Sequence, residues 1–463
     1  MKRWIAAATA GAVLATAAFA VSSAGRRTAD ERRPNILLIV VDTLRRDRVG
    51  IYASRHATTP TIDDLAAANV IFANAYANSN WTKPSIASLF TGLYVGQHGV
   101  KYVVTDQSGE LPMTQRLPED ATTIAEILKA DGYSTLGVVE NIHVSAKLGF
   151  SQGFDLWDES AYGAMNVTNR FIEHLDEAKG PLFAYVHYFD PHAPYYRTRF
   201  FETEGDITPG LQEAKSNDYR WTTYTFGVDC GIIGLSPIER QRLEALYDGE
   251  VRNADVGIAR ILATLKQKGL FENTWIIITA DHGENFYEGR RVTHPHDCFS
   301  NPQMRIPLVM KMPAATGDGN VVVTDAVQLV DIAPTIMALL GLQPLPGMVG
   351  ANVLPAVLDG KSLGARQIAA ESESGVMLVE SKYKYVSVPT KAGTFVFLYD
   401  ESADPLEEHD LAAGDPALAA RLDGLYKGAA EAAMKRETVK AAGNVRLSEE
   451  EVERMRSLGY LLH

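Results

Sequence analysis

Three stretches of the chain are almost continuously apolar, without the alternation that marks a half-exposed strand. They are Asn35–Val41, residues 182–189 and residues 274–280. Runs of this kind predict strands that are buried on both faces of a parallel sheet. Because such a sheet needs helices on both sides, the sequence predicts an α/β fold with a large, mostly parallel sheet flanked by helices.

The pattern of apolar and polar residues changes after about residue 360. Residues 375–389 and 394–399 predict antiparallel strands, and residues 416–435 predict a helix. We therefore expect a catalytic domain over residues 35–360 and a small C-terminal α+β domain, an antiparallel sheet with helices, over residues 361–463. Residues 197–240 have weak periodicity and predict a long excursion over the face that carries the site.

The first residues predict export. Residues 1–3 are basic at positions 2 and 3, and residues 4–21 are apolar and rich in alanine. We expect residues 1–24 to be a signal peptide or an N-terminal anchor and residues 25–34 to be a linker. The body of the protein should then be periplasmic or extracellular, anchored to the inner membrane only if the segment is not cleaved. The formal net charge of −13 argues against a nucleic-acid partner.

Polar residues of one chemical kind follow each of the three apolar runs. Asp42 follows the first, Asp190 and His192 the second, and Asp281 and His282 the third. In open α/β sheets, sites form where strands end. Carboxylate and imidazole together suit Zn²⁺ or Mn²⁺, and additional carboxylates would suit Ca²⁺ or Mg²⁺. The spacing predicts a metal site from Asp42, Asp281 and His282.

Residues 80–92 predict a helix with a hydroxyl at its start. Pro84 suits the first helical turn, and Gly92 suits the end. Thr82 then lies where N–H groups and the helix dipole favour an anion. Near a metal, its hydroxyl is a candidate nucleophile towards phosphorus or sulfur. The alternative is a Thr that caps a core helix.

At these residues the chain resembles the sulfatase family of the alkaline phosphatase superfamily. The resemblance extends over nearly the whole mature chain. It implies an alkaline phosphatase-like fold and hydrolysis of sulfuric or phosphoric esters. The motifs that carry it are residues 41–50, 82–92, 98–100, 117–125, 190–195, 247–250, 279–284 and 447–461.

The chain departs from the family pattern at four positions. Sulfatases have Cys or Ser in place of Thr82 and oxidise it to formylglycine, whereas oxidation of Thr would give a ketone. Ile86 replaces the usual Arg of this signature, Val41 an Asp that often precedes the metal-binding Asp, and Asn141 the usual Lys. We therefore expect no formylglycine. The pattern is similar to phosphodiesterases and phosphoglycerol transferases of the superfamily that use an unmodified Thr.

The resemblance implies a role for each candidate residue. The metal, one divalent ion (Mn, Ca or Zn), would be held by Asp42, Thr82, Asp281 and His282. Catalysis would depend on Thr82 as the nucleophile, with help from His192 and His143. Substrate would contact Lys83, Asn141 and His296, although Lys83 could equally be solvated. A second zinc could be held by Asp190, His192, His294 and His296, or His192 and His296 could instead bind substrate oxygen or protonate the leaving group.

These expectations lead to one main function and three alternatives. The main one is an exported metal-dependent hydrolase that cleaves a phosphodiester, phosphomonoester or sulfate ester of a small molecule, lipid or glycan. The alternatives are an arylsulfatase-like sulfuric ester hydrolase without formylglycine, a phosphoglycerol or phosphoethanolamine transferase of the cell envelope, and a pseudo-sulfatase that binds a glycan.

Overall fold

The computed structural model describes residues 33–52, 57–101, 103–104, 112–195, 224–225, 227–316, 319–436, 439–440 and 443–457. The predicted leader, residues 1–24, lies outside the described residues, as does most of the linker and of the excursion predicted over residues 197–240. Within the described part of the chain, every helix is too short or too polar to span a bilayer.

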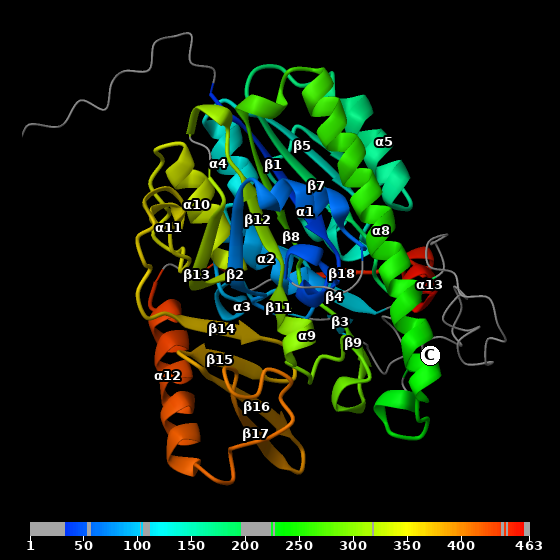
Figure 1. Cartoon of the computed structure of the whole chain (residues 1–463), viewed down its shortest axis with the longest axis vertical. Helices are drawn as coiled ribbons and strands as arrows, with labels where there is room; N and C mark the ends of the chain where they lie inside the picture. The colour runs from blue at the N-terminus through cyan, green and yellow to red at the C-terminus, as the bar shows by residue number, and fades with distance from the viewer. Residues whose placement is uncertain are drawn as a thin grey trace, which may run out of the picture. The chain divides into compact units, whose positions relative to one another are not determined.

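A nine-stranded sheet forms the centre of residues 34–463 (Figure 1). Across the sheet the strands are β11 (Arg305–Ile306), β2 (Val70–Tyr76), β12 (Leu308–Lys311), β8 (Thr274–Thr279), β1 (Asn35–Val41), β7 (Leu182–Tyr188), β5 (Ser134–Val139) and β6 (Leu156–Asp158), and β13 (Val321–Gln328) pairs with β2. All pairs from β8 to β6 are parallel, and β13 is parallel to β2. Only β11 and β12 run antiparallel to their neighbours. The predicted mostly parallel sheet is confirmed.

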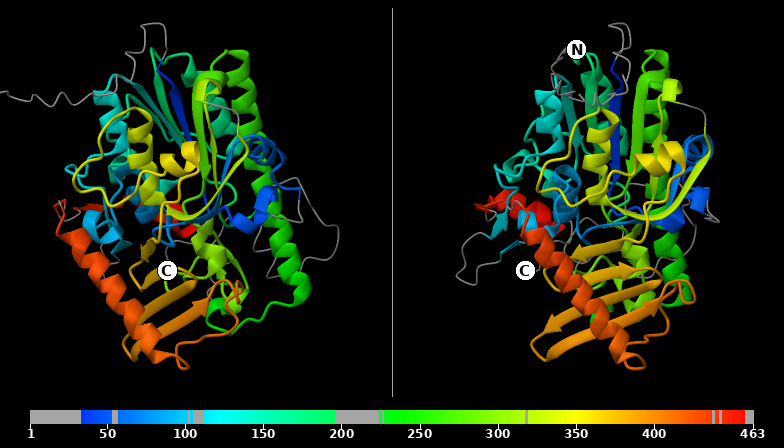
Figure 2. Two further views of the ribbon diagram at one scale, coloured as in Figure 1. Left: turned by 60° about the vertical axis from the view of Figure 1, so that its left-hand side comes forward. Right: turned by 90° about the vertical axis from the view of Figure 1, so that its left-hand side faces the viewer.

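Helices cover both faces of this sheet (Figure 2). On one face lie α1 (Pro60–Ala67), α5 (Ala164–Leu175) and α8 (Pro237–Gln267). On the other lie α2 (Thr82–Thr91), α4 (Ile124–Ala130), α10 (Ile332–Leu339) and α11 (Leu354–Asp359). The three predicted strands are buried at almost every position, as burial on both faces requires.

The C-terminal part forms a second, antiparallel sheet. Its strands are β14 (Gln367–Glu371), β15 (Val376–Glu380), β16 (Tyr383–Thr390) and β17 (Gly393–Asp400). Helix α12 (Pro416–Met434) packs on it through Leu422, which lies in one apolar cluster with Leu378 and Leu398. The predicted small antiparallel domain is therefore confirmed, whereas its boundary at residue 360 stays a prediction.

The remaining elements are short. They are α3 (Val95–His98), α9 (Asn301–Met304) and α13 (Glu449–Ser457), the pair β9 (Asn285–Phe286) and β10 (Val292–Thr293), and a three-stranded sheet of β3 (Val103–Val104), β4 (Met113–Gln115) and β18 (Asn444–Arg446). Cys230 and Cys298 are both free thiols, so no disulfide links them.

His98, at the end of α3, is fully buried against α2. Its Nδ1 accepts a hydrogen bond from the Val100 N–H at 3.1 Å, so Nε2 carries the proton and donates to Ser88 Oγ at 3.0 Å. Burial lowers the pKa of His98 to about 3 from its ordinary 6.5. His98 therefore stays neutral in the folded protein at a pH where the unfolded chain would charge it.

This difference predicts how His98→Gln changes the acid stability. Between the two pKa values the unfolded state binds a proton that the folded state does not, so the free energy of unfolding falls as pH falls. Removing His98 should make the slope of unfolding free energy against pH shallower by about 1.4 kcal/mol per pH unit, measured by denaturant unfolding at several pH values. An unchanged slope would show that His98 is charged in the folded protein.

Candidate active site and metal centre

The carboxyl ends of neighbouring strands bring the predicted metal ligands together. β1 lies between β8 and β7 and runs parallel to both. Val40 pairs with Thr279 of β8, and Val41 pairs with Tyr188 of β7. Asp42 and Asp281 therefore leave the sheet at the same edge, where open α/β sheets place their sites.

Asp42, Asp281 and His282 form a buried cluster in which one ligand atom from each lies within 4.8 Å of the others. Asp281 Oδ1 accepts hydrogen bonds from the N–H groups of Thr43 at 3.0 Å and His282 at 2.8 Å. Asp42 Oδ2 accepts one from Asn141 at 2.5 Å. The second oxygen of each carboxylate, Asp42 Oδ1 and Asp281 Oδ2, is buried without a hydrogen-bond partner among the described residues.

The ring of His282 is fixed by its own backbone. Nδ1 donates to the Gly283 carbonyl at 2.9 Å, which leaves the lone pair on Nε2, 3.6 Å from Asp281 Oδ2. The turn requires glycine at position 283, because a Cβ there would lie 2.0 Å from the carbonyl oxygen of Pro302. The Asp-His-Gly order thus presents both a carboxylate and an imidazole nitrogen to one point.

The electrostatics of the cluster favour a bound cation. Burial raises the pKa of Asp42 well above its usual range, and the charge of Asp281 raises it further. Burial also lowers the pKa of His282, which keeps the imidazole neutral. Two buried carboxylates and a neutral imidazole are a donor set that suits Zn²⁺ or Mn²⁺. These residues, with two carboxylate oxygens lacking donors, fit a divalent metal ion.

Thr82 is the first residue of α2 and is fully buried. The N-cap residue, Trp81, makes no side-chain hydrogen bond to the N–H groups of the first turn. Thr82 Oγ1 lies 3.3 Å from His282 Nε2. The structure therefore places the predicted nucleophile directly beside the metal cluster. At the other end, Gly92 takes the left-handed conformation with φ of 67° and ends the helix.

Two residues predicted to contact the substrate, Lys83 and Asn141, form hydrogen bonds with other parts of the protein. Lys83 is fully buried, not solvated: its Nζ donates to Thr114 Oγ1 and to the Gln115 carbonyl, the latter at 3.2 Å. Burial lowers the pKa of Lys83 to about 7. Asn141, in place of the family's Lys, donates to Asp42. In the structure Asn141 thus orients a candidate metal ligand.

Three histidines gather around the cluster: His143 and His192 are buried, and the side chain of His294 is 9% exposed. The rings of His192 and His294 are centred 4.9 Å apart, and those of His294 and His282 4.7 Å apart. His143 packs edge-on against Trp81, with ring centres 5.1 Å apart. Burial lowers the pKa of His143 and His192 well below the usual range and that of His294 to about 3. All three are therefore neutral at pH 7.

The four residues predicted for a second zinc do not form one group with metal-ligand spacing, although His192 and His294 lie side by side. Asp190 accepts hydrogen bonds from the Ala164 N–H at 2.9 Å and from Asn253 at 3.3 Å. Among the described residues, the only other group with metal-ligand spacing is partly exposed and lies elsewhere: Asp404, Glu408 and His409. A second zinc at Asp190, His192, His294 and His296 stays a prediction.

His294 and His296 pair instead with two glutamates. His294 Nδ1 lies 3.0 Å from Glu284 Oε1, and His296 Nδ1 lies 2.6 Å from Glu373 Oε1. Burial raises the pKa of Glu284 to about 8, so this carboxyl group is mainly protonated at pH 7. Glu373 belongs to the turn between β14 and β15, and it brings the C-terminal sheet to the wall of the site.

Sequence reasoning missed two residues of the site. Thr43 has a φ of 52°, a costly conformation for a β-branched residue, and its buried Oγ1 has no hydrogen-bond partner within the described part of the chain. His187, which has the appearance of a structural residue in the sequence, has its Nε2 3.4 Å from Asp42 Oδ2 and its Nδ1 2.8 Å from Tyr185 Oη. No local sequence pattern predicts the conformation of Thr43 or the contact of His187 with Asp42. The only signal in the sequence is that Thr43 directly follows Asp42.

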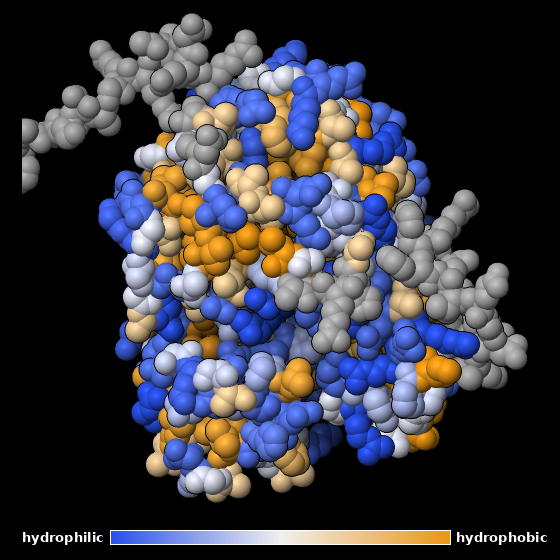
Figure 3. Space-filling model, in the orientation of Figure 1, coloured by the Kyte–Doolittle hydropathy of each residue, from blue (hydrophilic) through white to orange (hydrophobic). Residues whose placement is uncertain are grey.

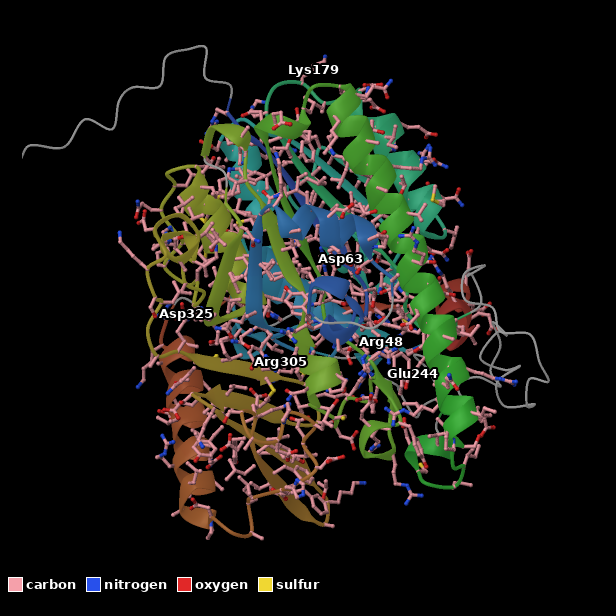
Figure 4. The ribbon with its side chains drawn as sticks, in the orientation of Figure 1. Arg48, Asp63, Lys179, Glu244, Arg305 and Asp325 are labelled. Atoms are coloured by element: carbon pink, nitrogen blue, oxygen red, sulfur yellow. The ribbon has the colours of Figure 1, made fainter. Side chains whose placement is uncertain are left out.

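A groove of about 500 Å³ lies apart from this cluster, between the large sheet and the C-terminal sheet. Its lining includes Arg305 and Asp325, both labelled in Figure 4, and the region is largely hydrophilic in Figure 3. Two of its three cations are already paired: Arg366 pairs with Asp331, and Lys382 pairs with Asp400. None of the metal-cluster residues lines it, so the buried cluster is the better candidate for chemistry.

Several known proteins are similar to this chain in sequence or in fold. The chain is 26% identical to the uncharacterized sulfatase YidJ of Escherichia coli over 82% of this chain and 83% of that protein. Its fold is similar to a solved 2-O GAG sulfatase, with a TM-score of 0.71, 20% identity and coverage of 88% and 95%. It is also similar to the phosphonate monoester hydrolase of Agrobacterium radiobacter, with a TM-score of 0.68, 20% identity and coverage of 90% and 100%.

The family model described as Sulfatase matches residues 34–342, which is more than half of the chain and includes every residue of the metal cluster. The chain therefore belongs to the sulfatase family, whose members hydrolyse sulfuric or phosphoric esters.

Proposed function

We propose that this protein is an exported, metal-dependent hydrolase with Thr82 as its nucleophile. Its substrate is an ester with one negative charge, and a phosphodiester is the first candidate. The observation that carries this proposal is the 3.3 Å separation between Thr82 Oγ1 and His282 Nε2, at the start of a helix and beside two buried carboxylates. Export rests on the leader-like sequence of residues 1–24.

The residues divide the work as follows. Asp42, Asp281 and His282 would hold the metal, which lowers the pKa of a nearby hydroxyl and offsets charge on the phosphoryl oxygens. Thr82 Oγ1 forms a bond to phosphorus, and the bond from phosphorus to the leaving oxygen breaks. Water then attacks phosphorus, and the Thr82 oxygen leaves.

His192 has the right protonation state to move protons in both steps. Its Nδ1 donates to the Ala193 carbonyl at 2.5 Å, so the lone pair is on Nε2. Because its pKa is lowered by burial, the neutral ring is a proton acceptor at pH 7. It can take the proton of the Thr82 hydroxyl and return it to the departing oxygen. His143 is equally neutral and is the second candidate for this role.

The charges around Thr82 favour a substrate with one negative charge. Ile86 is buried in the core where the family has Arg, and Asn141 stands where it has Lys. Lys83 is committed to β4, and the nearby histidines are neutral. Beyond a divalent metal and a helix N-terminus, the described site offers little to balance a dianion. A phosphodiester or phosphonate monoester carries one negative charge, whereas a phosphomonoester carries nearly two at pH 7.

Sulfate ester hydrolysis is the second candidate. A sulfate monoester also carries one charge, and one relative is named a 2-O GAG sulfatase. The unmodified side chain of Thr82 is the argument for placing phosphodiesters first, because it cannot form the aldehyde that a formylglycine enzyme uses. The organic part of the substrate would be a small molecule, a lipid or a glycan.

The choice of ester predicts an order of activities for the purified mature protein with Mn²⁺ or Zn²⁺. We expect kcat/KM for bis(4-nitrophenyl) phosphate to exceed that for 4-nitrophenyl phosphate by at least about tenfold, because the site lacks cations for a dianion. Thr82→Ala should reduce diester cleavage by at least about a thousandfold, and Thr82→Ser should retain part of it.

Each other outcome has a defined meaning. Thr82-dependent cleavage of 4-nitrophenyl sulfate with no diester cleavage would select the sulfatase candidate. Bound metal without hydrolysis of any ester would point to the transferase. Neither metal nor hydrolysis would leave a pseudo-sulfatase that binds a glycan.

The cluster also predicts one metal per chain, held by Asp281 and not by Asp190. Elemental analysis of the purified protein should find about one equivalent of divalent metal, because the described residues assemble one buried ligand group. Asp281→Asn should lose most of it. The matched variant Asp190→Asn should retain it, because Asp190 contacts Ala164 and Asn253 instead. Two equivalents of metal, one of them lost in Asp190→Asn, would contradict the single-metal site.

A further inference from the structure

The last described segment of the chain, residues 444–457, returns from the C-terminal sheet to the catalytic part. It consists of β18 and α13, red in Figure 1. β18 pairs antiparallel with β4, with Val445 opposite Thr114. A capping box fixes the start of the helix: Ser448 accepts from the Glu451 N–H at 3.2 Å, and the Ser448 N–H donates to Glu451 at 2.6 Å. The segment is therefore an ordered part of the fold.

Helix α13 contacts the loop that follows β5. Arg454 Nη2 donates to the carbonyl oxygen of Glu140 at 3.1 Å. Lys147, further along the same loop, forms an ion pair with Glu451 of α13. Between these polar contacts lies Ile142, which belongs to a small buried apolar cluster. The other members are Phe189, Leu447, Val452 and Met455.

The residues that α13 contacts are next to the site. Glu140 and Ile142 flank Asn141, whose side chain donates to Asp42 and accepts from the His143 N–H at 2.8 Å. Phe189 stacks on His192, with ring centres 4.5 Å apart. The cluster formed with α13 therefore contains the immediate neighbours of three candidate site residues: Asn141, His143 and His192.

The strand of the segment reaches the site by a second route. β4, its partner, supplies Thr114 and the Gln115 carbonyl, which accept hydrogen bonds from Lys83. Lys83 follows Thr82 directly in the first turn of α2. The segment thus supports the nucleophile end of the site through β4 and the metal-ligand end through Asn141.

We propose that residues 444–457 are a positioning element of the active site and that Arg454 is a positioning residue, acting through the Glu140 carbonyl on Asn141 and hence on Asp42. The proposal rests on the proposed metal-dependent function. Residues that orient a metal ligand typically change metal affinity 10- to 100-fold when they are removed. A displacement of the loop after β5 should therefore weaken metal binding while the protein remains folded.

Arg454→Ala in the full mature chain tests this. We expect the Kd for Mn²⁺ or Zn²⁺, measured by calorimetry, to rise about tenfold. At saturating metal, kcat should fall while KM changes little, because no substrate contact is lost. Arg454→Lys should recover much of the affinity, since a lysine can donate to the same carbonyl. The matched control is Arg421→Ala, which removes an arginine of α12 paired with Glu380 and far from these loops, and it should leave Kd unchanged.

A double-mutant cycle with Asn141→Ala separates positioning from general destabilisation. If Arg454 acts through Asn141, the two effects on Kd should not add, because the second substitution removes a link that is already broken. Additive effects, or an Arg454→Ala protein with unchanged Kd, would overturn the proposal.

Amide hydrogen exchange tests the positioning role of Arg454 without relying on the proposed function. In the metal-free protein, Arg454→Ala should speed amide exchange in residues 140–144 and not in β16 or β17. A wild-type protein that binds no metal would remove the proposed function, while this exchange result would still decide whether α13 holds the loop. Unchanged exchange in residues 140–144 would overturn the positioning role.

Discussion

Two carboxylates side by side in an apolar interior repel each other and lose their hydration, and a divalent cation between them offsets both costs while both stay ionised. This constraint governs the catalytic half of the protein. The pairing of β1 with β8 places Asp42 beside Asp281. Two backbone N–H groups donate to a single oxygen of Asp281. One oxygen of each carboxylate, Asp42 Oδ1 and Asp281 Oδ2, is left without a donor among the described residues. The surrounding helices, strand ends and buried histidines form an enclosure around these two carboxylates.

The same enclosure sets the charge state of its surroundings. Burial keeps His143, His192 and His294 neutral and protonates Glu284, so most groups that could carry charge near Thr82 do not. Charge at the site is thereby concentrated in the two aspartates and whatever cation they hold. An anionic substrate would meet a helix N-terminus and a metal, with few fixed cations to hold the outer oxygens of a dianion.

Much of this could be predicted from the sequence because it depends on short-range patterns. Apolar runs ended by Asp42 and by Asp281-His282 define buried strands and their ends, and Pro84 with Gly92 brackets the helix that begins at Thr82. The rest depends on contacts between distant segments. Asn141 bonds to Asp42 across 99 positions of sequence, and Lys83 is buried against β4. Asp190 has the same strand-end signature as Asp42, but its carboxylate lies within reach of the Ala164 N–H, at the start of α5. A strand-end rule cannot tell these two situations apart.

Glu373 lies in a turn of the C-terminal sheet but contacts His296 at the wall of the site, and neighbouring Ser372 donates to the His296 carbonyl at 2.7 Å. This turn, residues 372–375, contributes no strand to the large sheet and no ligand to the metal cluster. Gly375 is fixed in this turn, because a Cβ there would lie 2.7 Å from the carbonyl oxygen of Ser387, whereas the side chain of Glu373 is held only at its tip, by His296. In evolutionary terms, the proposed function would let a substitution of Glu373 alter the wall beside His296 while Asp42, Asp281, His282 and Thr82 stay unchanged.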